Sequence, residues 1–157
     1  MLGLILTLAV QATASMALLA LPMVAPAVGA ALGMSGTFVG YYISAAYIGA
    51  VLGSLLAGSL VPRLGSIRSS QLGLILVASG LGLSCTAHLA PMLVGALVLG
   101  LGYGPITPAS SHLLAQTSSP RHLSLIFSLK QTGVPLGGML AAALVPPLAM
   151  RTGWQWA

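Results

Sequence analysis

Long apolar stretches alternate with short segments rich in glycine, proline, serine and basic residues along the whole chain. The apolar stretches cover residues of about 2–28, 38–61, 71–87, 92–115 and 123–150. A helix needs about 20 apolar residues to cross the hydrocarbon core of a bilayer, and each stretch is close to that length or longer. The pattern therefore predicts an all-α integral membrane protein with five transmembrane helices, and residues 1–157 are expected to form part of a transmembrane helical domain.

The composition excludes a soluble globular domain. Hydrophobic residues make up 57% of the chain and charged residues 3%, whereas a soluble domain carries about 25% charged residues. All five charged residues are Lys or Arg, with no Asp or Glu, and they are scattered between apolar stretches. Nucleic-acid binding needs clustered basic residues on a solvated face, so we expect no nucleic-acid partner. The single Cys85 excludes a disulfide framework, and we expect no metal and no cofactor.

The basic residues between the apolar stretches predict an orientation in the membrane. Arg63, Arg68 and Arg121 fall in connections on the same side as the N-terminus, and only Arg151 falls on the other side. Short cytoplasmic loops carry an excess of Lys and Arg, so the N-terminus is expected in the cytoplasm. No basic residue precedes the first apolar stretch, which favours a retained span over a signal peptide. We therefore expect a multi-pass protein of the plasma membrane, in a bacterium the inner membrane.

The second and fifth apolar stretches repeat one another. Residues 49–64 align without a gap on residues 133–148, and nine of the sixteen positions are identical. The copies lie three helices apart, an odd number, so their directions across the membrane must be opposite. Inverted repeats of three helices are typical of secondary transporters. If residues 2–87 hold the first three helices, the second repeat lacks its third helix within this chain.

Three stretches resemble the N-terminal half, helices one to five, of the major facilitator superfamily. The connection after the second helix, Gly58 to Arg68, is similar to the family's loop motif through Gly58, Arg63, Gly65 and Arg68, although Pro62 stands where the motif has an acid. The fourth and fifth helices carry two further stretches that resemble the family, Gly100-Leu101-Gly102-Tyr103-Gly104-Pro105 and Lys130-Gln131-Thr132-Gly133-Val134-Pro135-Leu136-Gly137-Gly138.

The resemblance implies a bundle of inverted three-helix repeats and a function in transport rather than catalysis. We expect a secondary transporter that moves a small solute, with an organic anion as the favoured class, by alternating access. A sixth helix and a C-terminal half would complete the bundle. The alternative is a truncated membrane fragment that does not transport and needs a partner half.

Lys130 is the leading candidate for the substrate path. It lies about seven residues into the fifth apolar stretch, roughly 10 Å into the bilayer at the rise of an α-helix. A charge at such depth is costly and usually faces a cavity or a partner, although a lysine can also extend to the membrane surface. The other candidates on cavity-lining helices of the resembled family are Gln131, Tyr103, Gln11 and His112. For His112, helix packing and a role in proton movement remain open.

Glycines at matched positions of the repeat predict close helix packing. The pairs Gly49/Gly53 and Gly133/Gly137 each place bare backbone on one helix face, where another helix can approach closely. Pro135 removes one backbone hydrogen bond from the fifth helix. We expect these residues to form the packing surfaces over which the helices move during gating.

Two further predictions concern polar residues near helix ends. Tyr41 and Tyr42 are expected at the membrane interface, where tyrosines are enriched. Gly33-Met34-Ser35-Gly36 resembles the Gly-x-Ser-Gly of intramembrane serine proteases, with His88 as an imaginable base. Ser35 lies in a connection rather than in a late helix, and the motif alone is weak, so this enzyme is a remote alternative.

Overall fold

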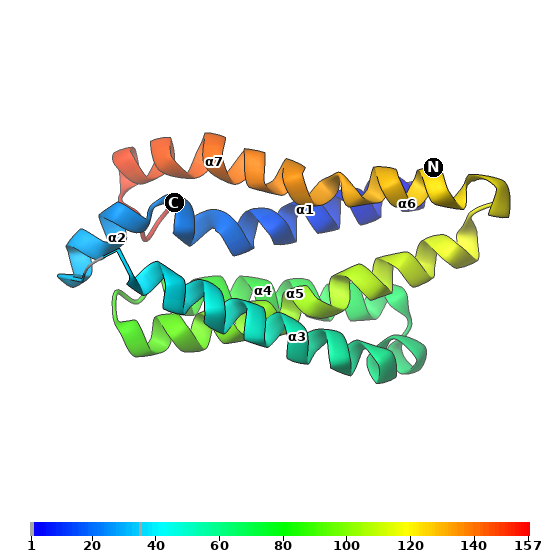
Figure 1. Cartoon of the computed structure of the whole chain (residues 1–157), viewed down its shortest axis with the longest axis horizontal. Helices are drawn as coiled ribbons and strands as arrows, with labels where there is room; N and C mark the ends of the chain where they lie inside the picture. The colour runs from blue at the N-terminus through cyan, green and yellow to red at the C-terminus, as the bar shows by residue number, and fades with distance from the viewer. Residues whose placement is uncertain (1, 35) are drawn as a thin grey trace.

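The computed structural model describes residues 2–34 and 36–157, and these residues fold into a bundle of long helices (Figure 1). The helices are α1 (Leu2–Met23), α2 (Ala25–Leu32), α3 (Phe38–Leu64), α4 (Ser66–Ser84), α5 (Leu89–Thr117), the 3-10 helix η1 (Pro120–His122), α6 (Leu123–Gln131) and α7 (Gly133–Thr152). In this part of the chain, five helical segments are long and apolar enough to cross a membrane, with η1, α6 and α7 together forming the fifth. The predicted fold class is confirmed.

Prolines divide the first and fifth helical segments. Pro26 has no backbone N–H for the carbonyl of Pro22, and α1 gives way to α2 two residues earlier, at Val24. Pro135 likewise has no N–H for the carbonyl of Gln131, the last residue of α6. Residues 2–32 and 123–152 are therefore each two α-helices joined end to end.

The connection between the second and third segments is a single residue. The sequence pattern treats residues 62–70 as a break, but α3 continues to Leu64 and α4 begins at Ser66. Gly65 between them has φ 80° and ψ 159°, a backbone conformation that strongly favours glycine. The Gly65 N–H donates to the carbonyl of Val61 at 2.9 Å and closes the last turn of α3.

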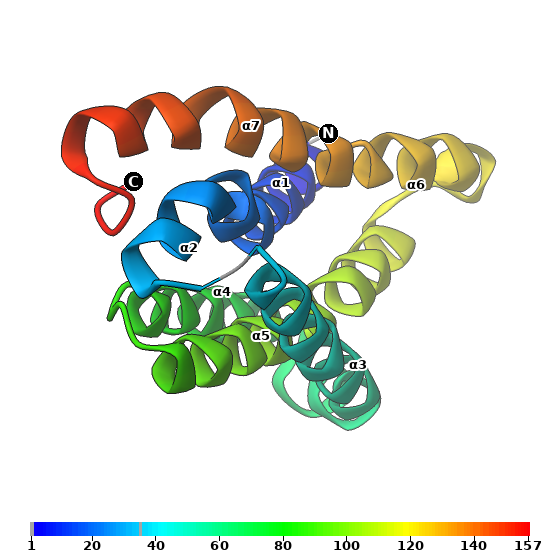
Figure 2. The ribbon, with the colours of Figure 1, turned by 60° about the vertical axis from the view of Figure 1, so that its left-hand side comes forward.

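The helices form two groups that meet along α1 and α5. The fourth span, α5, packs against both α3 and α4, while α7 packs along α1. Figure 1 shows α1 and α7 on one side and α3, α4 and α5 on the other, and Figure 2 shows α1 between α7 and the second group. Contacts of α1 with α5 and α4 join the two groups.

Glycines set the approach of α3 to α5. A methyl group added to Gly49 would collide with the backbone carbonyl oxygen of Leu97, and one added to Gly53 would collide with that of Leu101. These two helices therefore touch backbone to backbone. Any residue larger than glycine at these two positions would push the helices apart.

The same arrangement recurs between α7 and α1. A methyl group on Gly133 would come within 2.9 Å of the Leu8 carbonyl oxygen, and one on Gly137 would collide with that of Ala12. The second span thus packs on the fourth as the fifth packs on the first, as inverted three-helix repeats require. Burial follows the alignment of the repeat, with Gly49, Gly53, Ala57 and Val61 buried in α3 and Gly133, Gly137, Ala141 and Val145 buried in α7.

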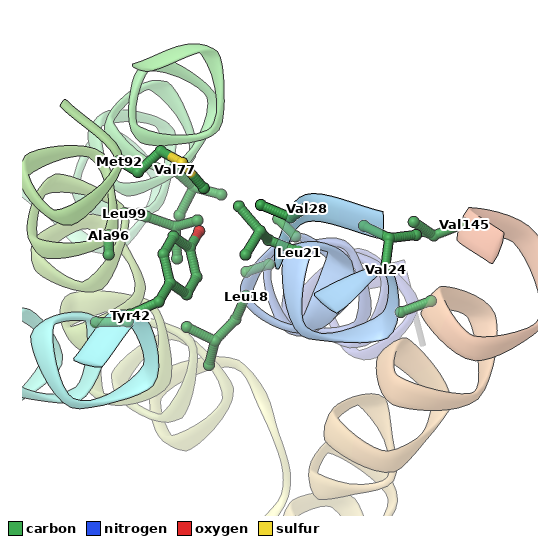
Figure 3. Packing of buried hydrophobic residues seen from close by; sticks show 14 of the residues in the cluster. Leu18, Leu21, Val24, Val28, Tyr42, Val77, Met92, Ala96, Leu99 and Val145 are labelled. Atoms are coloured by element: carbon green, nitrogen blue, oxygen red, sulfur yellow. The ribbon is translucent and has the colours of Figure 1, made fainter. Parts of the chain in front are cut away.

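An apolar core fills the space between the two groups of helices (Figure 3). Leu18, Leu21 and Val28 of the first segment face Leu99 and Met92 of α5. Large apolar side chains also point outward along α3 and α7, as expected for helices whose solvent is lipid.

The interfacial prediction is wrong for one of the two tyrosines. Tyr41 is exposed, but Tyr42 belongs to the core and is 1% exposed. Its hydroxyl forms a hydrogen bond with Ser84 Oγ at 3.3 Å, which gives the polar end of the ring a buried partner. The two adjacent tyrosines differ in burial because successive residues of a helix point in directions about 100° apart.

Enlarging a glycine of the α3–α5 contact tests this packing. Gly53→Leu should lower the free energy of unfolding by about 1–3 kcal/mol, because the helices must separate to admit the side chain. Gly58→Leu is the matched control, since Gly58 lies in the same helix with open space around it, and its effect should stay within about 0.5 kcal/mol. Unfolding in detergent, followed by circular dichroism, measures both. Equal effects would contradict the backbone contact.

Candidate functional site

Lys130 is a buried cation at the C-terminal end of α6. Only 1% of its surface is exposed, and it is the one buried residue of α6. In the alignment of the repeat it corresponds to Ala46 of α3, which is also buried. Both copies of the repeat therefore bury the side chain at this position. Only the second copy carries an ammonium group there.

The Lys130 ammonium group is held by α5. Its Nζ donates to the backbone carbonyl of Thr107 at 3.2 Å and to Ser111 Oγ at 3.3 Å. Thr107 and Ser111 lie four residues apart, so one face of α5 presents both acceptors. The ammonium group has three hydrogens, and these two bonds use two of them.

Gln11 of α1 extends the polar cluster. Thr107 Oγ1 donates to Gln11 Oε1 at 3.2 Å, and Gln11 Nε2 donates to the Tyr103 hydroxyl at 3.5 Å. The side chain of Gln11 is fully buried, so these bonds supply the partners that its amide needs inside the bundle. The Tyr103 hydroxyl also forms a hydrogen bond with Ser15 Oγ at 3.4 Å. One connected set of polar groups thus joins α1, α5 and α6, and we call it the Lys130 cluster; its members are Gln11, Ser15, Tyr103, Thr107, Ser111 and Lys130.

The electrostatics of the cluster are one-sided. Every hydrogen-bonding partner of Lys130 in the described chain is neutral, and the sequence contains no Asp or Glu. A buried cation is stable when it is paired with an anion, and nothing in these 157 residues can form that ion pair. Within these residues the Lys130 ammonium group therefore has hydrogen-bond acceptors but no counter-charge.

The structure brings together three of the five predicted pathway residues, Lys130, Tyr103 and Gln11. The side chain of Gln131 is exposed and outside the cluster. His112 lies next to Ser111 in sequence, but its Nδ1 forms a hydrogen bond with Ser66 at 3.0 Å, at the start of α4. The roles of all five residues in a substrate path stay predictions.

Sequence reasoning missed Thr107 and Ser15 as members of the cluster. Small hydroxyl side chains are common in membrane helices and often bond to their own backbone, so residue type alone does not single them out. The spacing of Thr107 is informative, because residues 103, 107 and 111 share one helix face with four-residue intervals.

The other predicted positions lie elsewhere. Arg63 and Arg68 of the loop motif are exposed around the α3–α4 turn at Gly65, and Gly58 lies in α3 with open space beside it. Ser35, of the remote protease alternative, lies outside the described residues, and His88 precedes α5. In the described residues, no group of three or more His, Cys, Asp or Glu side chains could hold a metal ion.

Comparison with known proteins identifies the family. The family model described as Major Facilitator Superfamily matches residues 4–157. The chain belongs to the major facilitator superfamily. Its relatives are transporters rather than enzymes, and this chain is a multi-pass membrane protein of that family.

Relatives with different solutes match the chain. It is 27% identical over 128 residues to the gentisate transporter of Corynebacterium glutamicum, covering 78% of this chain and 29% of the relative. It is 31% identical over 142 residues to the 4-hydroxybenzoate transporter PcaK of Pseudomonas putida, covering 87% and 31%. It is 29% identical over 125 residues to the glucose transporter GlcP of Staphylococcus epidermidis, covering 78% and 28%. The chain thus spans about a third of the length of these relatives. No solved structure matches the chain.

Removing the charge of Lys130 should stabilise the isolated chain. Lys130→Met keeps a long side chain and eliminates a buried cation that has no counter-charge, so the free energy of unfolding should rise by about 1–3 kcal/mol. Arg151→Met is the matched control, because Arg151 is an exposed cation at the end of α7, and its effect should stay within about 0.5 kcal/mol. Chemical unfolding in detergent gives both values. A loss of stability in Lys130→Met would mean that the lysine serves to hold α6 on α5.

Proposed function

We propose that this chain is the N-terminal part of a secondary transporter that moves a small organic anion by alternating access, with Lys130 as the group that binds the anion. The observation that supports this most strongly is the burial of Lys130 among neutral partners in a chain without carboxylates. Such a cation costs stability, and a site that binds an anion gives a reason for its presence.

The Lys130 cluster has the chemistry of a site for an anion with polar substituents. The third ammonium hydrogen of Lys130 can donate to a carboxylate oxygen, and the hydrogen bond is then charge-assisted on both sides. Tyr103 and Gln11 add neutral donors and acceptors close by, which could bind a hydroxyl group of the same solute. Two of the relatives named above transport gentisate and 4-hydroxybenzoate, which are both hydroxylated aromatic carboxylates.

The glucose transporter among the relatives represents the opposite case, a neutral solute. A neutral solute would not compensate the Lys130 charge, and no carboxylate side chain among these 157 residues does so. The charge therefore favours an anion, and an aromatic carboxylate is the class that fits both the cation and the relatives.

The glycine contacts supply surfaces suited to motion. Between α3 and α5, and again between α1 and α7, backbone lies against backbone, so helices can slide or rock without side chains interlocking. Pro135 and the break at Thr132 weaken the fifth segment immediately after Lys130. A change in the direction of α6 relative to α7 would open the site around Lys130 to one side of the membrane or the other, as alternating access requires.

We further propose that segments outside these 157 residues complete the transport site. Since the chain spans about a third of its relatives, a sixth helix and a C-terminal half would supply the second wall of the site. The alternative is a fragment without transport of its own, which acts only when a partner half is supplied.

We place the protein in the plasma membrane, the inner membrane of a bacterium, with the Arg63 and Arg121 connections and the N-terminus in the cytoplasm. An impermeant maleimide should not label the cysteine of Ser119→Cys in sealed cells. Ready labelling of this cysteine would contradict the orientation.

Lys130 variants test the function in the intact transporter that contains this chain. With 4-hydroxybenzoate as the probe, Lys130→Ala should weaken uptake affinity at least about tenfold, because a charge-assisted hydrogen bond is lost. Lys130→Arg should retain part of the affinity, since a cation remains at similar depth. Arg121→Ala removes a loop cation outside the Lys130 cluster and should leave affinity unchanged.

Membrane abundance is measured alongside uptake to separate binding from folding. A lysine that only extends to the membrane surface predicts reduced abundance in Lys130→Ala with unchanged affinity. That result would remove Lys130 from the substrate path. Absence of saturable uptake for both 4-hydroxybenzoate and gentisate by the unmodified protein would reject the proposed solute class itself.

A further inference from the structure

A second polar region lies at the end of the bundle where α3 turns into α4. A groove of about 770 Å³ is lined by the end of α3, the first turns of α4 and the last turns of α5. Its polar groups include Arg68 and Gln71 of α4 and His112 and Gln116 of α5. It shares no residue with the Lys130 cluster, so the proposed transport site does not account for it.

The groove presents several hydrogen-bond donors to one space. The Arg68 guanidinium carries five N–H groups, and the side-chain amides of Gln71 and Gln116 add more. The hydrogen bond between His112 Nδ1 and Ser66 Oγ, at 3.0 Å, fixes the imidazole against α4. No other hydrogen bond of this ring occurs in the described part of the chain, which leaves Nε2 for a ligand in the groove.

Arg68 is an exposed cation that lines the groove. The sequence has no Asp or Glu, so no internal ion pair can form. Phosphate oxygens match the planar fork of a guanidinium and also accept from amides and imidazole. The N-terminus of α4, capped by Gly65 without a side-chain hydrogen bond, adds the positive end of a helix dipole at the same place.

One residue of the groove, Pro62, differs from the resembled loop motif in a way that bears on anion binding. It lines the groove at the position where the resembled motif has an acidic residue. A carboxylate there would compete for Arg68 and repel a second anion. With proline in its place, the groove carries positive charge without an internal competitor.

The surroundings of the groove select an amphiphile rather than a small free anion. Leu64 and Ile67, which also line it, are 42% and 62% exposed. They stand at the ends of two candidate membrane spans, Phe38–Leu64 and Ser66–Ser84, and therefore at the boundary between lipid and water. Basic pockets between helices at this depth suit charged lipid headgroups, with acyl chains against the neighbouring apolar side chains.

We propose that the groove between the α3–α4 turn and the end of α5 binds an anionic phospholipid, with Arg68 and His112 on the headgroup phosphate and Leu64 and Ile67 beside the acyl chains. A bound lipid would tie α4 to α5 at this end of the bundle, next to the hydrogen bond between Ser66 and His112.

Lipid titration of the purified chain in detergent tests the site. Phosphatidylglycerol should bind in preference to phosphatidylcholine, seen as retained lipid in native mass spectrometry and as a rise in melting temperature. Arg68→Gln should weaken phosphatidylglycerol binding by about fivefold, the loss expected for one cation near a lipid surface. Arg121→Gln removes one exposed cation outside the groove and is the matched control. Pro62→Asp, which leaves every basic residue in place, should also weaken binding.

Three results would overturn the proposal. An equal loss in Arg68→Gln and Arg121→Gln would show general attraction to an anionic surface. Equal stabilisation by inorganic phosphate alone, at the same concentration as phosphatidylglycerol, would show a site for the free ion. Unchanged lipid preference in Pro62→Asp, with the fold intact by circular dichroism, would place any bound lipid elsewhere.

Discussion

The fold depends on backbone-to-backbone contact between helices. In a bilayer, apolar side chains gain little by leaving lipid for protein, so close packing must supply the attraction between helices. Gly49 and Gly53 provide it for α3 on α5, and Gly133 and Gly137 provide it for α7 on α1. Because both contacts occur at the same register of the repeat, one packing rule positions both pairs of helices.

The chemical site follows from that packing. The α1–α7 contact places the fifth segment against α1, and the contacts of α1 with α5 close the group. Lys130, three residues before Gly133, is thereby turned inward against Thr107 and Ser111. The cation is therefore held beside a close backbone contact and next to a weakened helix joint.

Much of this could be predicted from the sequence, and the exceptions have physical reasons. Hydropathy predicts the five spans. Glycines and prolines at matched positions predict the repeat, because these residue types act through the backbone. Lys130 stood out because charge is rare in this chain, whereas Thr107 and Ser15 are ordinary residues of membrane helices whose role depends on which helix lies opposite.

Tyr42 and residues 66–70 show a further limit of sequence patterns. Tyr42 lies beside an exposed tyrosine and differs from it only in helical direction, which depends on the packing of α3 against α4. Residues 66–70 are polar enough to indicate a loop, yet one glycine with positive φ makes the whole turn and leaves them helical. In both places the three-dimensional arrangement decides between two conformations that the local sequence allows.

We propose that a buried cation without a counter-charge in these residues selects an anionic solute. The most direct measurement is the binding affinity of the intact transporter for 4-hydroxybenzoate and for 4-hydroxybenzamide, which match in size and differ in charge. The carboxylate should bind at least about tenfold more tightly, because only the carboxylate compensates the charge of Lys130. Equal affinities, or tighter binding of the neutral amide, would contradict it.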